Sequence, residues 1–188
     1  MISSCFSDYP FGQVPVLEVD GKMLGQSNSI ARYLAKKHGL AGQDDWEEAM
    51  ANMYADSLMD VINAGLPYRF ESDPEKKKQL LQELVTKNVR PHIQLIEKRL
   101  AENGTGYLVG SSVSCKFVKL SLAELISYDS RPIQLTWADL GYADVIPTFL
   151  ELVPDLLDNA PHLKKLLDAI EAIPSIKKWI ETRPVTPM

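Results

Sequence analysis

The chain has 188 residues, 45% of them hydrophobic and 24% charged, with a formal net charge of −5 and a pI near 5.2. This composition supports a buried core in one large or two small domains. The acidic balance argues against nucleic acid or an anionic membrane as the main partner. No apolar run reaches the length of a membrane span and no charged-then-apolar leader opens the chain, so we expect no membrane association.

The cysteines and histidines are few and widely spaced. Cys5 and Cys115 cannot form a disulfide framework, and neither stands in a CxxC pair, which favours a reduced, cytoplasmic setting. The three histidines, His38, His92 and His162, show no metal-ligand spacing, and we therefore expect no metal site.

The first forty residues predict a hairpin followed by a helix. Residues 1–10 are polar and lack periodicity, which indicates a loop. Val16–Val19 is rich in strand formers, and Asp20-Gly21 predicts a two-residue turn because glycine tolerates the positive φ that such a turn needs. Residues 22–25 then form the return strand. An amphipathic helix is expected from Ile30 to about His38.

Two features of this segment suggest a binding site. The first strand follows Pro15, which has no N–H. A cis peptide bond costs little energy only when the residue after it is proline. Ser27 stands at the expected N-cap, where its hydroxyl and the nearby amides would suit a carboxylate. A strand edge beside a helix N-terminus suits a small anionic peptide. The residues alone leave a second interpretation open, in which Ser27 only caps its helix.

A polar linker over residues 40–45 separates this segment from a helical region. A long helix is expected from about Trp46, with one apolar stripe. Asp56 and Asp60 lie one turn apart beside that stripe, and from the residues alone a solvated helix edge is the favoured interpretation.

The rest of the chain predicts further helices. Residues 64–74 end the long helix and bring Tyr68 and Phe70 together, and the next helix, 75–102, should kink at Pro91. Thr136 and Asp139 have capping-box spacing. The last helices are expected over residues 162–172 and 175–181.

Several of these motifs resemble the second half of the glutathione-binding domain of a glutathione S-transferase. They are Gln13-Val14-Pro15, the hairpin Leu17–Gly21, Gln26-Ser27 and Ile30–Leu34. The sigma class, which includes prostaglandin D synthases and many invertebrate enzymes, is the most similar. The resemblance implies an α+β fold, in which a partial thioredoxin-like domain (1–40, hairpin plus helix) precedes an all-α domain (45–188).

The resemblance also implies roles for single residues in binding glutathione. The Val14–Pro15 bond would be cis, and the backbone of Val14 would pair with the cysteinyl part of glutathione, with Gln13 nearby. Gln26 and Ser27 would hold the γ-glutamyl carboxylate.

Other implied roles lie in the helical domain. Asp60 would reach across a homodimer to the glutathione amino group of the other subunit, and Asp56 would lie at the same interface. Tyr68 and Phe70 are candidates to line the pocket for a hydrophobic electrophile, although aromatics near a helix end more often serve packing.

The family pattern is incomplete at the N-terminus. In the family a βαβ unit precedes the position of Phe11, and its first strand ends in the catalytic tyrosine. Tyr9 does not match that position, so we expect an N-terminally truncated member and assign no catalytic residue. A two-stranded remnant would expose a sheet edge and lower solubility.

The resemblance also pauses between Ser112 and Leu135. Val113–Gln134 carries no family motif. One explanation is a surface insertion, since loops accept added length at modest entropic cost. The other is a translated intron, because Val113-Ser114 and Gln134 can be encoded by splice-site-like sequences.

Two functions follow from the resemblance. The first is enzymatic, with glutathione conjugated to hydrophobic electrophiles in detoxification or used as a cofactor in isomerisation. The second is a non-catalytic glutathione-transferase-like protein that binds ligands or partners.

Overall fold

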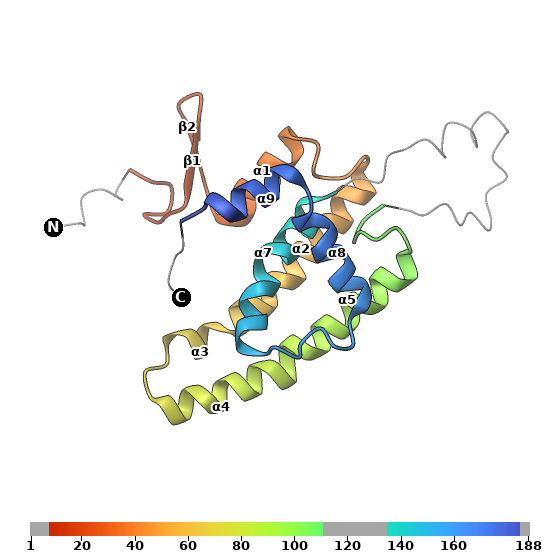
Figure 1. Cartoon of the computed structure of the whole chain (residues 1–188). Helices are drawn as coiled ribbons and strands as arrows, with labels where there is room; N and C mark the ends of the chain where they lie inside the picture. Colours follow the sequence, from red (N-terminus) through yellow and green to blue (C-terminus); the bar gives the residue numbers. More distant parts are fainter. Residues whose placement is uncertain (1–7, 111–134, 185–188) are drawn as a thin grey trace, which may run out of the picture.

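The computed structural model describes residues 8–110 and 135–184, in which a hairpin and one helix precede a bundle of helices (Figure 1). The hairpin consists of β1 (Val16–Val19) and β2 (Lys22–Gly25) and leads into α1 (Ser27–Lys37). The helices that follow are α2 (Asp45–Ala64), α3 (Leu66–Phe70), α4 (Pro74–Leu84), the π-helix η1 (Val85–Val89), α5 (Arg90–Asn103), α7 (Trp137–Leu152), α8 (Pro161–Glu171) and α9 (Pro174–Thr182). The predicted α+β class is confirmed. The insertion expected at 113–134 lies outside the described residues.

The hairpin has the predicted register and turn. Its strands are antiparallel, with Val16 opposite Gly25 and Val19 opposite Lys22. Asp20 and Gly21 have φ values of 50° and 72°, as a two-residue turn with positive φ at both central positions requires. In the described part of the chain, β1 and β2 form a two-stranded sheet.

The start of α1 differs from the prediction. The N-cap is Gln26, with φ 71° and ψ 115°, and Ser27 is the first helical residue, without a side-chain cap. The helix therefore begins three residues before Ile30, and the N-cap role predicted for Ser27 was wrong. The apolar spacing from Ile30 did not locate a buried face, because Tyr33 and Leu34 are exposed and the buried residue of the helix is Ala35. Its beginning is decided by the left-handed backbone of Gln26, where the chain leaves β2.

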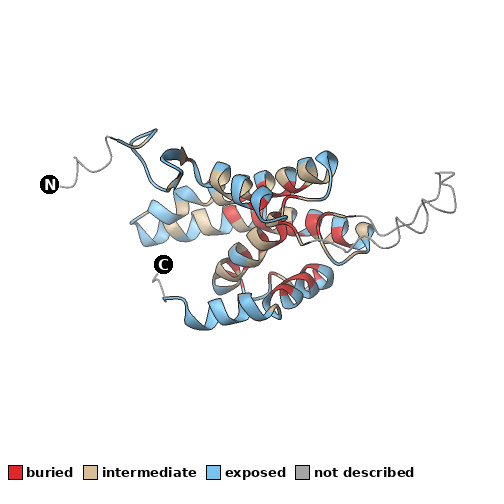
Figure 2. Cartoon of the chain, turned by 90° about the horizontal axis from the view of Figure 1, so that it is seen from above, coloured by how far each residue is buried: buried red, intermediate tan, exposed pale blue. Residues whose placement is uncertain are grey.

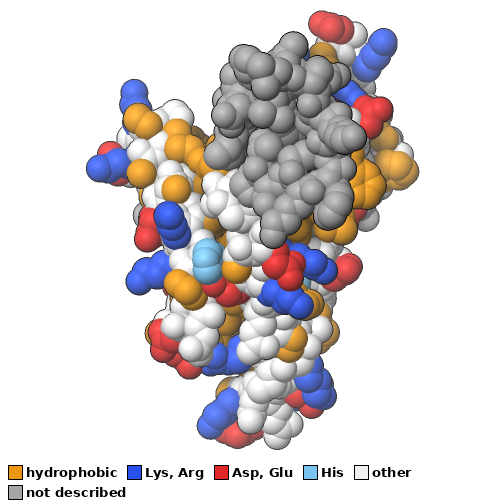
Figure 3. Space-filling view, turned by 90° about the vertical axis from the view of Figure 1, so that its right-hand side faces the viewer, with side chains coloured by type: hydrophobic (Ala, Val, Ile, Leu, Met, Phe, Trp, Pro, Cys, Tyr) orange, Lys and Arg blue, Asp and Glu red, His pale blue; other side chains and the backbone are white. Residues whose placement is uncertain are grey.

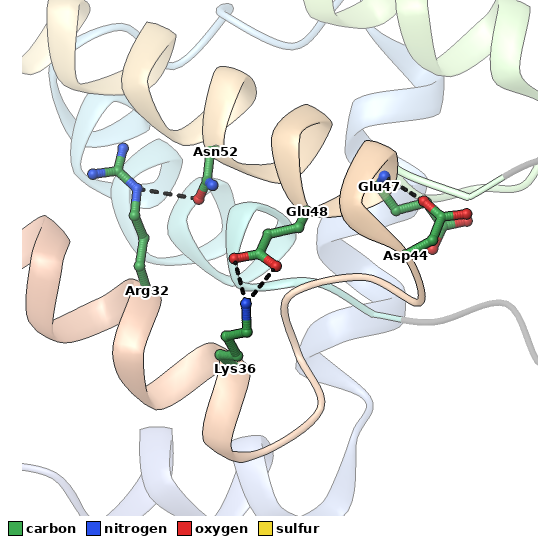
Figure 4. Close-up of polar contacts among 6 residues, drawn as sticks. All are labelled: Arg32, Lys36, Asp44, Glu47, Glu48 and Asn52. Atoms are coloured by element: carbon green, nitrogen blue, oxygen red, sulfur yellow. Dashed lines mark hydrogen bonds and ion pairs between the residues drawn. The ribbon is translucent and has the colours of Figure 1, made fainter.

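Side-chain caps explain where α2 begins. The carboxylate of Asp44 accepts a 2.8 Å hydrogen bond from the N–H of Glu47, as Figure 4 shows. The Glu47 carboxylate in turn accepts one of 2.8 Å from the N–H of Gln43. The first bond satisfies an amide of the first turn that an isolated helix start would leave unpaired, and the second ties the residue before the N-cap to that turn.

The predicted kink at Pro91 takes the form of a π-helical turn. The N–H of Arg90 donates to the carbonyl of Val85, five residues back, at the end of η1. Pro91 has no N–H, and its ring would collide with a carbonyl in a regular preceding turn. The wider turn of η1 accommodates the ring, so α4 and α5 are separate helices where the sequence predicted one kinked helix.

The core lies among the helices. Its largest fully buried side chains include Leu100 on α5, Tyr142 and Ile146 on α7, and Leu163 and Leu166 on α8. Figure 2 shows the buried residues gathered where these helices meet.

Asp139 is the buried carboxylate of this core, with no exposed surface. It accepts hydrogen bonds from the N–H of Leu108 (2.8 Å), the N–H of Thr136 (2.8 Å) and the hydroxyl of Thr136 (2.7 Å). The predicted capping pattern between Thr136 and Asp139 is therefore confirmed. Burial raises the pKa of Asp139, although these donors act in the opposite direction.

Two further observations concern the surface. On the face in Figure 3, acidic and basic side chains are interspersed around hydrophobic ones. Among the described residues, no helix combines the length and apolar character needed to cross a membrane.

Candidate functional site

A pocket of about 120 Å³ lies where the end of β2 and the start of α1 meet the loop before β1. Its lining consists of Phe11, Gln13, Val14, Pro15, Gly25, Gln26 and Ser27. Five of these seven residues are the N-terminal site residues that the sequence predicted. The structure therefore brings Gln13, Val14, Pro15, Gln26 and Ser27 together on one surface.

The backbone on one side of the pocket has the expected form. The Val14–Pro15 peptide bond is cis, in agreement with the resemblance. β1 begins directly after Pro15 and pairs with β2 along one edge. Within the described residues its other edge has no sheet partner. An extended peptide laid along that edge would find strand-type donors and acceptors.

The opposite side of the pocket is the N-terminus of α1. The first intrahelical hydrogen bond runs from the N–H of Ile30 to the carbonyl of Gln26, at 3.0 Å. The N–H groups of residues 27–29 thus have no partner inside the helix, and no acidic side chain stands in the first turn. The positive end of the helix dipole favours a carboxylate here. Gln26, held at φ 71°, is an exposed part of the same lining.

Sequence reasoning did not assign Phe11 and Gly25 to the site. A Cβ atom on Gly25 would lie 3.2 Å from Cδ2 of Phe11, so the glycine makes room for the aromatic ring. The ring is 64% exposed. An aromatic residue directly before Gly12, whose φ is 61°, was the signal for a ring presented by a turn.

The chemistry of this lining is that of recognition. The side chains of the seven lining residues are apolar, amide or hydroxyl groups, and none is ionisable. They can donate and accept hydrogen bonds and contact apolar surface. They do not supply a general acid or base.

The remaining predicted residues lie elsewhere in the same chain. Asp60 is exposed on α2 and is not part of the pocket lining. Tyr68 packs partly against the helical core, and the Lys77 ammonium lies 5.1 Å from its ring centroid. Phe70, at the end of α3, is 78% exposed. The structure does not bring these three residues to the pocket.

Asp56 has a partner within the chain. Its carboxylate forms an ion pair with the guanidinium of Arg32 on α1, and the Arg32 Nε–H also donates to Oδ1 of Asn52 at 3.1 Å. One turn further along α1, Lys36 lies 3.0 Å from Oε2 of Glu48 (Figure 4). These contacts hold α1 against α2.

Sequence reasoning missed this docking of α1 on α2. A signal was present, because Arg32 and Lys36 are four residues apart on one helix and Glu48, Asn52 and Asp56 follow the same spacing on the next. Residues four apart share a helix face, so complementary groups at this spacing indicate two faces that meet.

Comparisons with known proteins agree with this architecture. The model of the glutathione S-transferase C-terminal domain matches residues 59–131 and 133–183, and the model of the N-terminal domain matches residues 5–36. Glutathione S-transferase 1 of Ascaris suum is 37% identical over 95% of this chain and 77% of its own length. The hematopoietic prostaglandin D synthase of Homo sapiens is 36% identical over 96% of this chain and 77% of its own length.

Solved structures give the same result. A Nu-class GST from Haemonchus contortus superposes with a TM-score of 0.77 at 38% identity, over 97% of this chain and 79% of that one. A prostaglandin synthase D of Nilaparvata lugens superposes with a TM-score of 0.75 at 34% identity, over 96% of this chain and 79% of that one.

A thioredoxin-like unit with a pocket at its cis-proline loop, followed by an all-helical domain, is the architecture of a glutathione-dependent transferase. The chain belongs to the glutathione S-transferase family. Its similarity to nematode transferases and to prostaglandin D synthases confirms the predicted sigma-type resemblance. Transferases of this family use glutathione as co-substrate, which confirms the predicted ligand class.

Proposed function

We propose that the chain binds glutathione in the pocket between the cis-proline loop and the start of α1. The γ-glutamyl carboxylate would lie at Gln26 and Ser27, where the helix N-terminus favours an anion. The cysteinyl backbone would pair with Val14, beside Pro15 and Gln13. The observation that carries this proposal is that one pocket gathers all five residues.

In this proposal the bound thiol is presented to small hydrophobic electrophiles, for conjugation or for isomerisation, in the cytoplasm. Tyr68 and Phe70 remain candidates to contact the electrophile. A homodimer is part of the proposal, because Asp60 lies outside the pocket of its own chain. Its exposed position on α2 leaves the carboxylate accessible to the amino group of glutathione bound in a second copy.

A second candidate function is binding of glutathione or related ligands without catalysis. It is favoured by the absence of an ionisable side chain among the seven lining residues that the structure describes. A generic aromatic halide as electrophile separates the two functions. Measurable conjugation above the uncatalysed rate supports the transferase, whereas glutathione binding without turnover supports the second candidate.

Calorimetric titration with glutathione tests the site itself. Ser27→Ala should weaken binding by about tenfold, because a hydrogen bond to a charged group contributes about 1.5 kcal/mol or more. Ser29→Ala is the matched control, since it removes the same hydroxyl two residues further along α1 and outside the lining. Cysteinylglycine, which lacks the γ-glutamyl group, should not distinguish Ser27→Ala from the unsubstituted protein. Equal loss in both serine variants, or no binding of glutathione by the unsubstituted protein, would contradict the assignment.

The role of Asp60 needs a separate test. Asp60→Asn should weaken glutathione binding only at protein concentrations at which sedimentation shows a dimer. Asp168→Asn, an exposed substitution on α8, should leave binding unchanged. A monomer that binds glutathione as tightly as the dimer would exclude the proposed contact between subunits.

A further inference from the structure

The N-terminal unit is joined to the helical domain through α1. The hairpin packs on α1, which in turn packs on α7, and Figure 1 shows the hairpin projecting away from the bundle. Between residues 8 and 40 the buried positions are Gly25 and Ala35. So little buried apolar surface cannot by itself determine how α1 is rotated on the bundle. Polar contacts therefore contribute to that orientation.

Arg32 makes the most extensive of these contacts. Its Nε–H donates to Asn52 at 3.1 Å, its Nη2 pairs with Asp56, and its guanidinium carbon lies 5.5 Å from the centroid of the Trp137 ring. The side chain is 34% exposed. A planar guanidinium that bonds through two nitrogens and lies near an aromatic ring is restrained in orientation as well as in position.

A backbone hydrogen bond also joins the end of α1 to the start of α7. The N–H of Trp137 donates to the carbonyl of Leu40 at 2.8 Å, just after the end of α1. Trp137 opens α7 directly after Thr136, which is fixed by the buried Asp139. Arg32 therefore rests on a part of the bundle that is itself rigidly held.

Lys36 provides the contrast on the same helix. It is 70% exposed and contacts the carboxylate of Glu48 through a single ammonium group. Glu48 raises the pKa of Lys36 by hydrogen bonding and by its charge. An exposed pair of this kind is screened by solvent and restrains orientation weakly. The orientation of α1 thus depends on Arg32 more than on Lys36.

The orientation of α1 affects the pocket, because two pocket residues stand at the start of this helix. Gln26 precedes α1 and Ser27 begins it, while Arg32 lies five residues after Ser27, a distance of about 8 Å at 1.5 Å per residue. Because the helix is stiff, a rotation at Arg32 displaces Gln26 and Ser27 as well. We propose that Arg32 is a positioning residue, which orients α1 on Asn52, Asp56 and Trp137 and so sets the geometry of the glutathione pocket. This inference rests on the proposed function.

The test uses three variants of the full chain. Arg32→Gln removes the charge and most of the N–H donors of the guanidinium group. Arg32→Lys keeps the charge but places it on a single ammonium group. Lys36→Met is the matched control on the same helix. Each is examined by thermal melting, by calorimetric titration with glutathione, and by hydrogen–deuterium exchange of the amides of residues 30–35, which are hydrogen-bonded within α1.

For Arg32→Gln we expect a cooperative melt, faster exchange at residues 30–35 and glutathione binding weakened about tenfold. Arg32→Lys should recover less than half of the lost glutathione affinity, measured as the logarithm of Kd, because lysine cannot reproduce two directed contacts. Lys36→Met should change binding less than about twofold. Where turnover is measurable, KM for glutathione should rise more than kcat falls.

Several outcomes would overturn the inference. They are unchanged exchange at residues 30–35 in Arg32→Gln, full recovery by Arg32→Lys, or equal losses in Arg32→Gln and Lys36→Met. A failure of the proposed function is distinguishable, because the unsubstituted protein would then bind no glutathione while the exchange measurement still reports whether Arg32 holds α1.

Discussion

The ββα unit and the helical domain of this protein are built on different physical principles. In the helical domain, large side chains such as Tyr142, Leu100 and Ile146 are almost completely buried, and Asp139 is buried with them and fully hydrogen-bonded. Between residues 8 and 40 only Gly25 and Ala35 are buried, and most of this unit is exposed in Figure 2. The pocket lies in the ββα unit, which has few buried residues.

The difference separates stability from recognition. Apolar burial scales with the area removed from water, so the helical domain provides most of the stabilisation. The ββα unit contributes exposed backbone, a left-handed residue and a helix N-terminus, which are features suited to binding a small peptide. Substitutions should therefore divide into those that change the free energy of unfolding and those that change binding.

The largest effect is expected at Asp139. Asp139→Ala removes the acceptor of three hydrogen bonds in the core and leaves buried donors unpaired, so the free energy of unfolding should fall by about 3 kcal/mol. That corresponds to a Tm lowered by about 6–12 °C in a chain of this size, measurable by calorimetry. Asp144→Asn, on the same helix but 75% exposed, is the control and should melt like the unsubstituted protein. Equal Tm values for both variants would contradict the stabilising role of the buried Asp139 in the helical domain.

A smaller effect is expected at Glu97, which caps α8 from α5. Its carboxylate accepts from the N–H groups of His162 (3.1 Å) and Leu163 (2.9 Å), and Ala160, the N-cap of α8, offers no side-chain acceptor. Glu97→Gln should lower the free energy of unfolding by about 1 kcal/mol at pH 7. The measurement is chemical denaturation, with the exposed Glu102→Gln as control.

The Glu97 effect should depend on pH with a definite sign. Burial acts to raise the pKa of Glu97, but the hydrogen bonds from Leu163 and His162 outweigh it, and the pKa lies below the ordinary 4.5. A lowered pKa gives stability that is present above 4.5 and lost as the pH falls through the folded-state value. The difference between Glu97→Gln and the unsubstituted protein should therefore shrink below pH 4.5. A difference that grows on acidification would contradict the capping role.

At Gln26, the effect of a substitution on stability can be separated from its effect on glutathione binding. Gln26→Gly and Gln26→Ala both remove the side chain from the pocket, so both should weaken glutathione binding to a similar degree. Only glycine adopts φ 71° without strain, so the alanine variant should be less stable than the glycine variant by about 1 kcal/mol. Calorimetric titration and chemical denaturation of both variants measure the two effects. A large difference in binding between them would show that backbone strain, not the side chain, governs recognition.

The smallest expected effect is at His92, whose Nε2 lies 2.8 Å from the hydroxyl of Tyr142. Burial lowers the pKa of His92 below 6.5, and the charge of Asp60 opposes that shift. Because the unfolded chain binds the proton more readily, the free energy of unfolding should fall as the pH drops from 6.5 towards the folded-state pKa. His92→Gln keeps a polar group near Tyr142 and should flatten this dependence. An unchanged pH profile in that variant would show that His92 does not titrate with unfolding.

Local signals predicted much of this structure. The hairpin, its Asp20-Gly21 turn, the helix breaks at glycine and proline, and the Thr136–Asp139 cap each depend on a few adjacent residues whose backbone preferences are strong. The family motifs predicted the cis bond at Pro15 and the residues that share the pocket. The N-cap was wrong because Gln26 adopts a left-handed backbone that its residue type does not favour.

By itself, then, the sequence determined the order of most elements and five of the seven residues that line the pocket, since these follow from local preferences and from motifs within some twenty residues. Only the tertiary structure decided which distant side chains meet. Arg32 pairs with Asp56 and lies near Trp137, and Glu97 caps a helix that begins some sixty residues later. Such contacts depend on how helices rotate and pack against one another, and that rotation is set by the whole core rather than by any one segment.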